Sequence, residues 1–418
     1  MRPAGILMLA GTARGGNMAA PQESVPQPQA GTARTARRPE LDVIRLVVVI
    51  GLVFFHAALV FDTRDDYYVK NATTTEATTW IAGLCVVWAM PALFLIAGLG
   101  SWHSIRSRGA GGFARERLLR LGVPLVVATL TILPLPPWLR LKAADPGYDE
   151  SYPRFLLRFF DVHLSLTDLP FVVRGEHFES GHLWFVVLLL AFSLVLAPLV
   201  AWLPADRMAR VLDAAAGAMA RRGVVLLPAL PLAVIGALLG MEESFAGWSR
   251  WAYLVFFLYG FALAADDRFR AAMRRDAVPA AIAGIALFAA AGVALDTAGG
   301  DPFTDLTLPA AVARVLFATA GWCWLVAILG LLDRPRPAAP PASDSPGVYA
   351  YLGLAALPLY VLHQPIVVAM AYVVVQWQIP APLKYVVIVA ASFAIMFVVY
   401  EFGVRRTRPT RLLFGVRG

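Results

Sequence analysis

The segment LDVIRLVVVIGLVFFHAALVFD, residues 41–62, decides the class of fold. It is almost entirely apolar over the roughly 20 residues that a helix needs to cross the hydrocarbon core of a bilayer. Two ionisable side chains interrupt it, Arg45 near its start and His56 towards its end. Because such groups are costly at membrane depth, they point to a function as well as to a membrane span.

The rest of the chain has the same character. Of its 418 residues, 59% are hydrophobic and 15% are charged, which is more apolar than a soluble protein of this length requires. The predicted fold class is therefore all-α, a polytopic membrane bundle of about ten transmembrane helices. The expected spans are approximately 43–62, 78–101, 118–139, 182–203, 224–241, 250–265, 278–296, 308–331, 348–375 and 383–404.

The net charge of +8 is explained by topology. With a cytoplasmic N-terminus, the inside segments carry 24 basic residues and the outside loops carry nine. This bias predicts that both termini are cytoplasmic, and it makes a nucleic-acid partner the weaker interpretation. Membrane lipid is the expected surrounding, and the sequence leaves the oligomeric state open.

The chain divides into three parts by composition. Residues 1–38 are rich in Gly, Ala, Pro, Gln and Arg and are expected to form a disordered cytoplasmic tail. Residues 39–404 form the transmembrane domain with a long outside loop at 140–181, and residues 405–418 form a basic cytoplasmic tail. Cys85 and Cys323 fall in apolar spans and predict no disulfide framework. Since no metal-ligand pattern, P-loop or dinucleotide fingerprint is present, no metal and no bound cofactor are expected.

Arg45 and His56 are predicted to share one face of their helix. Eleven residues correspond to three turns plus about 20°, so the two side chains leave the same side about 16 Å apart. Asp42, one turn before Arg45, is placed to orient it through an ion pair. This arrangement suits a long donor with an anionic head and a reactive far end. The structural alternative is that Arg45 reaches the headgroups and His56 only hydrogen-bonds a neighbouring helix.

The third span opens with RERLLRLGVPL, residues 115–125. Arg117 and Arg120 are i, i+3 neighbours, so on an α-helix they share a face and could clamp phosphate oxygens. The competing interpretation is that arginines at this rim serve topology alone.

GEHFESGHLWF, residues 175–185, closes the outside loop. Glu179 and His182 are candidate catalytic groups, an orienting carboxylate and a second imidazole, although loop acids are commonly only solvated. Trp184 is expected to be an interfacial anchor.

ALPLYVLHQPIVV, residues 356–368, places Tyr360 and His363 near the middle of the ninth span. They are candidate supporting residues, and the prolines beside them favour a structural role as the alternative. Arg314 in the eighth span is expected to reach outward to the membrane surface, and a role as a cavity residue is the alternative.

Taken together and in order, these motifs resemble the acyltransferase-3 family of integral membrane proteins. The motifs are the Arg45–His56 spacing, MPALFLIAGLGSW at 90–102, RLLR at 117–120, HLWF at 182–185 and PLYVLHQP at 358–365. The likeness runs from about residue 38 to 416 and, with YEFGVRRTRPTRLLFG at 400–415, extends to glucan-modifying succinyltransferases of that family.

The resemblance implies a bacterial inner-membrane enzyme that takes an acetyl or succinyl group from cytoplasmic acyl-CoA and transfers it to a glycan hydroxyl. It further implies that His56 is the catalytic histidine, that Arg45 belongs to the same motif, and that Arg117 and Arg120 bind the donor. A secondary transporter or flippase for an anionic or acylated substrate is the alternative from another class, and a structural membrane subunit is a third. The sequence does not identify the acyl group or the glycan.

Overall fold

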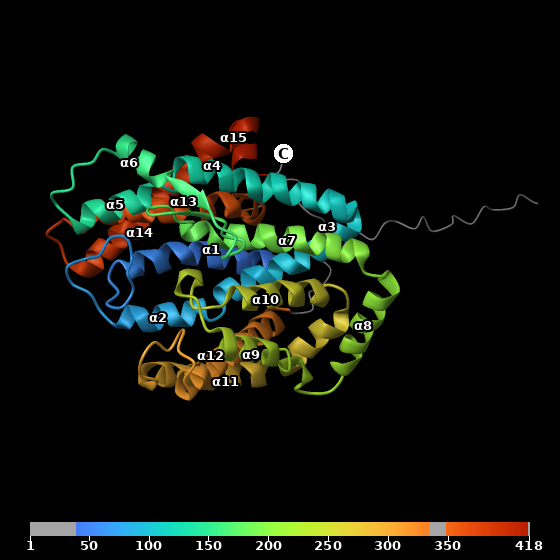
Figure 1. Ribbon diagram of the computed structural model, residues 1–418. Coiled ribbons are helices and arrows are strands. Elements are labelled where there is room, and N and C mark those ends of the chain that lie inside the picture. Colours follow the sequence, from blue (N-terminus) through green and yellow to red (C-terminus); the bar gives the residue numbers. More distant parts are fainter. Residues whose placement is uncertain (1–38, 334–347, 417–418) are drawn as a thin grey trace, which may run out of the picture. The chain divides into compact units, whose positions relative to one another are not determined.

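The computed structural model describes residues 39–333 and 348–416, so the expected N-terminal tail at 1–38 lies outside the described residues. Helices make up nearly all of its regular structure (Figure 1). The helices are α1 (Pro39–Leu59), α2 (Ala77–Val86), α3 (Ala89–Arg117), α4 (Val123–Thr131), α5 (Leu135–Ala144), α6 (Tyr152–Phe159), α7 (Trp184–Trp202), α8 (Ala205–Ala218), α9 (Ala229–Leu239), α10 (Arg250–Leu263), α11 (Asp267–Thr297), α12 (Leu308–Leu332), α13 (Val348–Val374), α14 (Ala381–Val398) and α15 (Arg408–Leu413). Short 3-10 or π segments are η1 (Leu118–Gly122), η2 (Gly181–Leu183), η3 (Val224–Leu226), η4 (Glu243–Phe245) and η5 (Val399–Val404).

The predicted all-α membrane bundle is confirmed. Seven helical stretches in the described residues are long and apolar enough to cross a membrane, and the one at Ala77–Ala144 contains both the second and the third expected span. Shorter helices occupy the expected spans at 224–241 and 250–265: an apolar helical stretch at Val224–Leu239, which contains α9, and α10. That these two segments cross the membrane stays a prediction. Gly240, with a φ of +77°, follows the last residue of α9.

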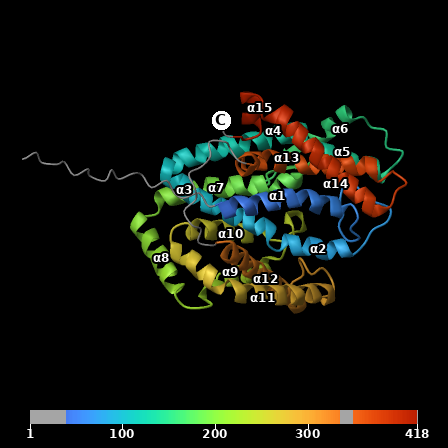
Figure 2. The ribbon, with the colours of Figure 1, turned by 180° about the vertical axis from the view of Figure 1, so that it is seen from behind.

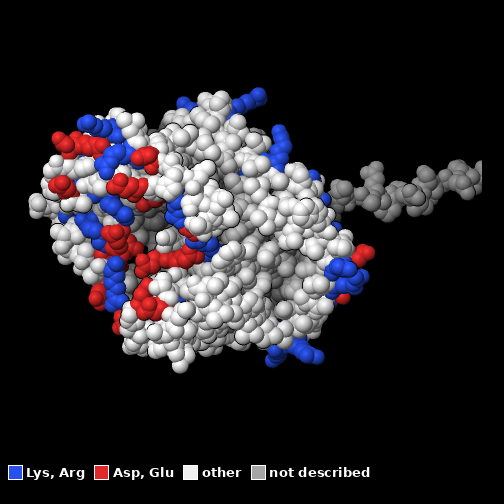
Figure 3. All heavy atoms as spheres, viewed as in Figure 1, with Lys and Arg blue, Asp and Glu red and all other residues white. Residues whose placement is uncertain are grey.

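The connections between helices fall at two ends of the bundle. Figures 1 and 2 show the 60–76, 298–307 and 375–380 connections at the end that carries α5 and α6, and α8 at the opposite end. The charge count assigns the first group to the outside and the α8 region to the inside, so the arrangement of helices agrees with the expected grouping of loops. Figure 3 shows charged side chains concentrated at the α5–α6 end, with a broad uncharged surface beside them.

The expected outside loop at 140–181 contains regular structure of its own. It contains the end of α5, all of α6, and an antiparallel hairpin of β1 (Val162–Leu164) and β2 (Val173–Gly175). Arg250 at the start of α10 holds the tip of this hairpin through hydrogen bonds. Its guanidinium donates to the Asp168 carboxylate and the Leu169 carbonyl at the tip, and also to the Glu242 carboxylate. The expected C-terminal tail likewise contains a helix, α15.

Helix α3 is two arms joined at a kink. Gly109 has φ +70° and ψ 171°, backbone values that break the helix and that glycine adopts readily. The first arm crosses α10 closely, since a β-carbon on Gly98 would fall onto the Phe257 carbonyl oxygen and 2.8 Å from the Phe261 nitrogen. The second arm runs back into η1, a π-helical turn that leads into α4.

Candidate active site

The stripe of α1 that carries Arg45 and His56 faces the protein interior. Val49 and Val53, which lie between them on the same side, are buried, whereas Val47 and Phe54 on the other side are 54% and 44% exposed. The helix is continuous from Pro39 to Leu59, so the eleven-residue spacing keeps both side chains on one side, as the sequence predicts.

Three histidines from three separate elements, His56, His182 and His363, form a cluster with His363 between the other two. The His56 and His363 ring centroids lie 5.0 Å apart, and those of His363 and His182 lie 4.9 Å apart. His182 begins the helical stretch that leads into α7, and His363 lies in the middle of α13. The candidates that the sequence offered in three separate motifs therefore form one cluster.

Hydrogen bonds to backbone oxygens fix two of the imidazoles. His182 Nε2 bonds the Val361 carbonyl at 2.9 Å, and His363 Nδ1 bonds the Tyr360 carbonyl. A carbonyl only accepts, so both of these ring nitrogens carry the proton. In the neutral ring the other nitrogen, which is Nε2 of His363, is then an acceptor.

Polar groups of α13 also hold the chain that leads to His182. The Tyr360 hydroxyl donates to the His182 carbonyl, and Gln364 Oε1 accepts from the His182 backbone nitrogen at 2.9 Å. Tyr360 thus contacts the cluster, as expected of a supporting residue, and Gln364 holds the backbone at His182.

Three ring nitrogens of the cluster are left for other partners. His56 Nδ1, His182 Nδ1 and His363 Nε2 are buried, and none of them has a hydrogen-bond partner among the described residues. Buried polar atoms are nearly always satisfied, so an exception calls for an explanation such as catalysis or a bound molecule. Within the described part of the chain no three His, Cys, Asp or Glu side chains are placed to hold a metal ion.

Two tyrosines and a carboxylate border the cluster on its α5–α6 side. The ring of Tyr67 stacks on His56 with centroids 5.8 Å apart, and the hydroxyl of Tyr68 donates to Glu179. The Arg140 guanidinium lies 4.6 Å over the Tyr68 ring. Burial raises the pKa of Glu179, an effect that the Tyr68 hydrogen bond and the Arg140 charge oppose. Burial also raises the pKa of Tyr68 well above its usual range.

Glu179 reaches the cluster only through other groups. A β-carbon on Gly181 would lie 3.5 Å from the Tyr68 hydroxyl and 3.8 Å from Gln364 Oε1, so the Glu179–Tyr68 pair lies beside the Gln364–His182 contact. Glu179 is therefore at the rim of the site and hydrogen-bonds a tyrosine there.

The candidate arginines lie on other segments than the histidine cluster, Arg45 near the start of α1, Arg117 at the end of α3 and Arg120 in η1. Arg45 Nη1 lies 3.3 Å from Asp42 Oδ1, which is the ion pair expected from their spacing. Arg117 Nη2 donates to the Ser101 hydroxyl at 3.1 Å, and Arg120 lies 3.8 Å from Glu116.

Arg117 is the last residue of α3, and Arg120 lies in the π-helical turn η1, so their spacing is not that of a regular α-helix. The two side chains have different partners, and their shared role at the donor stays a prediction.

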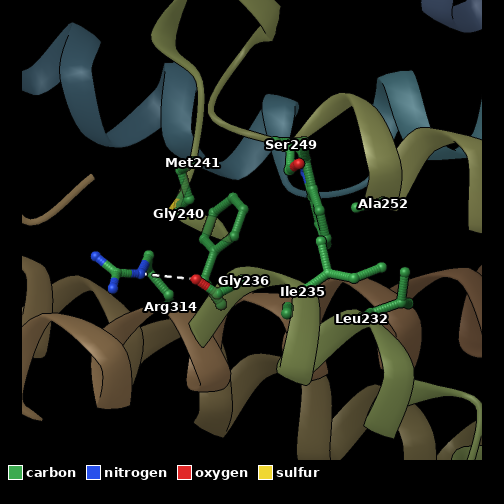
Figure 4. A pocket seen from close by; sticks show the side chains of 11 residues that line it. Leu232, Ile235, Gly236, Gly240, Met241, Ser249, Ala252 and Arg314 are labelled. Atoms are coloured by element: carbon green, nitrogen blue, oxygen red, sulfur yellow. Dashed lines mark hydrogen bonds between the residues drawn. The ribbon is translucent and has the colours of Figure 1, made fainter. Parts of the chain in front are cut away.

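Two further expectations are wrong. Trp184 is buried among Phe94, Phe245 and Tyr253 and is no interfacial anchor. Arg314 does not reach outward, because it is fully buried and donates to the Gly236, Ala237 and Pro302 carbonyls. Two of these carbonyls belong to the last turn of α9, and Figure 4 shows the bond to Gly236 beside a small pocket. Arg314 therefore caps a helix end.

Sequence reasoning missed Tyr67, Tyr68 and Ser101. The paired tyrosines in DDYYVK, directly after the first span, are a usable signal, because aromatic residues at that depth lie next to the outer end of α1. Ser101 has no comparable signal, since its contact with Arg117 depends on the kink at Gly109.

Comparison with protein families gives a match over nearly the whole chain. The model for the family described as "Acyltransferase domain", the acyltransferase-3 model, covers residues 38–401. No match was found among curated proteins or among solved structures. The matched region begins at the start of α1 and contains all three clustered histidines as well as Arg45, Arg117 and Arg120.

Proposed function

Because the chain belongs to the acyltransferase-3 family and is a multi-pass membrane acyltransferase, we propose that it transfers an acetyl or succinyl group from acyl-CoA to a glycan hydroxyl. In this reaction His56 acts as the general base. In this proposal the protein lies in a bacterial inner membrane with both termini cytoplasmic. The donor approaches from the arginine end of the site, and the glycan approaches from the α5–α6 end.

The convergence of His56 and His363 supports the proposal most directly. A general base must be able to accept a proton near neutral pH, and imidazole is the side chain best suited to that task. Structural histidines in membrane helices usually hydrogen-bond a neighbouring helix, yet His56 Nδ1 and His363 Nε2 have no such partner among the described residues.

The chemical step needs one proton to move twice. His56 takes the proton from the acceptor hydroxyl as that oxygen attacks the thioester carbonyl. The carbon–sulfur bond then breaks, and the imidazolium returns the proton to the leaving thiolate, so that an ester and free coenzyme A result. An acyl-histidine intermediate, in which His56 attacks the thioester first, is the minor variant.

His363 is suited to orient His56. Its Nδ1 is committed to the Tyr360 carbonyl, so its Nε2 is an acceptor that faces the same cluster as His56 Nδ1. With centroids 5.0 Å apart, a rotation of either ring, or one bridging water, lets His56 Nδ1–H donate to His363 Nε2. This contact would leave His56 Nε2 as the base, the same logic by which a second group orients the histidine of a hydrolase triad.

Positive charge at the other end of α1 suits the donor. Guanidinium groups bind phosphate oxygens with paired hydrogen bonds, and coenzyme A carries several phosphate groups. Arg45, Arg117 and Arg120 are assigned to these phosphates, and Asp42 is assigned to hold Arg45 through the ion pair at 3.3 Å. The axial distance of about 16 Å between Arg45 and His56 leaves room for an extended arm between phosphate and thioester.

The rim at Glu179, Tyr68 and Arg140 is assigned to the acceptor. Sugar hydroxyls both donate and accept hydrogen bonds, and this rim offers a carboxyl, a phenol and a guanidinium. The phenol of Tyr68 lies beside Gly181, the residue before His182, and contacts both Glu179 and Arg140. Glu179 and His182 are proposed to position the acceptor hydroxyl towards His56.

Mass spectrometry of envelope glycans tests the proposal. Glycans from cells that carry the gene should contain acyl esters that are absent after its deletion and that return with the wild-type gene but not with a His56→Ala gene. Unchanged glycan acylation, accompanied by loss of uptake or export of an anionic solute, would favour the transporter alternative instead.

A further inference from the structure

Ser101 makes an unusual contact for a serine in a membrane helix. It is fully buried on the first arm of α3, and its hydroxyl donates to the Ala97 carbonyl one turn earlier at 2.8 Å. The hydroxyl proton is therefore committed, and the oxygen is left to accept. Arg117 Nη2 donates to that oxygen at 3.1 Å.

The contact exists because α3 folds back on itself. Ser101 and Arg117 are separated by 16 positions, which a straight helix would place about 24 Å apart. The break at Gly109 reverses the chain, so the second arm returns Arg117 to the level of Ser101. An ion pair between Arg108 and Glu116, at 3.3 Å, spans the same turn.

A second neutral group holds the same guanidinium. The Arg117 side chain lies 5.0 Å over the ring of Phe113, which is fully buried. A hydroxyl oxygen and an aromatic face are both neutral, so these two contacts fix the direction of the guanidinium without themselves adding negative charge.

We propose that Ser101 is a positioning residue for the acyl donor, holding the Arg117 guanidinium in the orientation that binds a donor phosphate. The inference rests on the proposed function, since it deepens the assignment of Arg117 to the donor. It predicts that loss of the hydroxyl weakens donor binding while the chemistry at His56 continues once donor is bound.

Steady-state kinetics of the purified full-length protein in liposomes test this role. Acetyl-CoA and succinyl-CoA serve as donors and the isolated glycan as acceptor. Ser101→Ala should raise the KM for the donor about tenfold and leave kcat within about twofold, because the lost bond is one to a charged group used in binding. Arg117→Gln should raise the donor KM at least as much.

Ser193 supplies a matched control. It is also fully buried and donates to the carbonyl one turn earlier, that of Leu189, at 2.7 Å. Ser193→Ala should leave both kinetic constants near those of the wild type. Ser101→Cys keeps the size of the side chain but offers only a weak acceptor, so it should raise the donor KM even where Ser101→Ala fails to accumulate in the membrane.

A double variant separates positioning from general loosening of the fold. If Ser101 acts through Arg117, then adding Ser101→Ala to Arg117→Gln should raise the donor KM no further. The inference is overturned if Ser101→Ala and Ser101→Cys keep the wild-type donor KM while Arg117→Gln raises it, or if the two effects multiply. Failure of the proposed function looks different, because the wild-type protein would then show no transfer from either thioester.

Discussion

His56 and His363 lie with their ring centroids 5.0 Å apart, although His56 belongs to α1 and His363 lies in the middle of α13, about 300 residues later in the chain. Neither His56 Nδ1 nor His363 Nε2 has a hydrogen-bond partner among the described residues. The pair thus joins two motifs far apart in the sequence into one candidate catalytic unit. His182 completes the cluster from the start of the α7 stretch.

Replacing His363 should slow the chemical step. His363→Ala removes the acceptor assigned to orient His56, so kcat should fall by about 10- to 100-fold with little change in the donor KM. Initial rates at saturating acyl-CoA provide the measurement. His163→Ala, on the exposed strand β1, is the control and should retain wild-type kinetics. A donor KM that rises while kcat stays constant would assign His363 to binding instead of orientation.

The half-buried carboxyl of Glu179 should make stability depend on pH. Burial raises its pKa in the folded protein, so the folded state binds more protons than the unfolded state over a window that opens near the unfolded value of about 4.3. Stability should therefore fall as the pH rises through this window, and it should do so less in Glu179→Gln, which stays neutral.

Thermal unfolding in detergent between pH 4 and pH 8 measures this effect. The Tm difference between Glu179→Gln and wild type should grow with pH, whereas Glu176→Gln, a change at an exposed position of the same loop, should follow the wild type. A difference that shrinks as the pH rises would mean that the folded state favours the charged carboxylate.

Two neighbouring glycines should respond in opposite ways to alanine. Gly98→Ala drives a β-carbon into the backbone of α10 at Phe257, so it should destabilise the protein by about 1–3 kcal/mol. Gly100 lies two residues further along the same arm, and a β-carbon added there meets no atom within 4 Å. Gly100→Ala should therefore be neutral or slightly stabilising. Equal Tm values for the two variants would show that α3 and α10 do not cross as described.

Arg314 should matter for stability and not for kinetics. Arg314→Met leaves three backbone carbonyls without their donor, which should cost about 2–4 kcal/mol and lower the Tm by several degrees. The kcat and donor KM of the remaining folded protein should match the wild type. Arg207→Met, on the exposed surface of α8, should change stability by less than about 0.5 kcal/mol. A raised donor KM in Arg314→Met would show instead that this arginine takes part in substrate binding.

The membrane spans could be predicted from the length of the apolar segments, and the inward-facing side of α1 from the helical spacing of its residues. The stripe from Arg45 to His56 faces inward because a continuous α-helix preserves its phase over three turns. The same rule is less exact for Arg117 and Arg120, because it assumes α-helical geometry where the chain forms the π turn η1. A local change of helix type leaves no trace in hydropathy.

Contacts between distant segments could not be predicted from one sequence. The motifs that contain His56, His182 and His363 were each recognisable, yet nothing in their spacing states that the three rings meet. The partners of Arg314 could not be predicted either, since they are carbonyls of the last turn of α9, and that helix ends before Gly240. Ionisable residues in spans are easily found, but their partners depend on packing.

The central claim is that His56 performs the proton transfer, and it is tested most directly with purified protein in liposomes supplied with radiolabelled acyl-CoA and glycan. Single-turnover transfer by His56→Ala should be slower than wild type by about 10²- to 10⁴-fold, with unchanged Tm and unchanged donor binding. His56→Ala protein that is folded, binds donor and transfers the label at the wild-type rate would contradict the account.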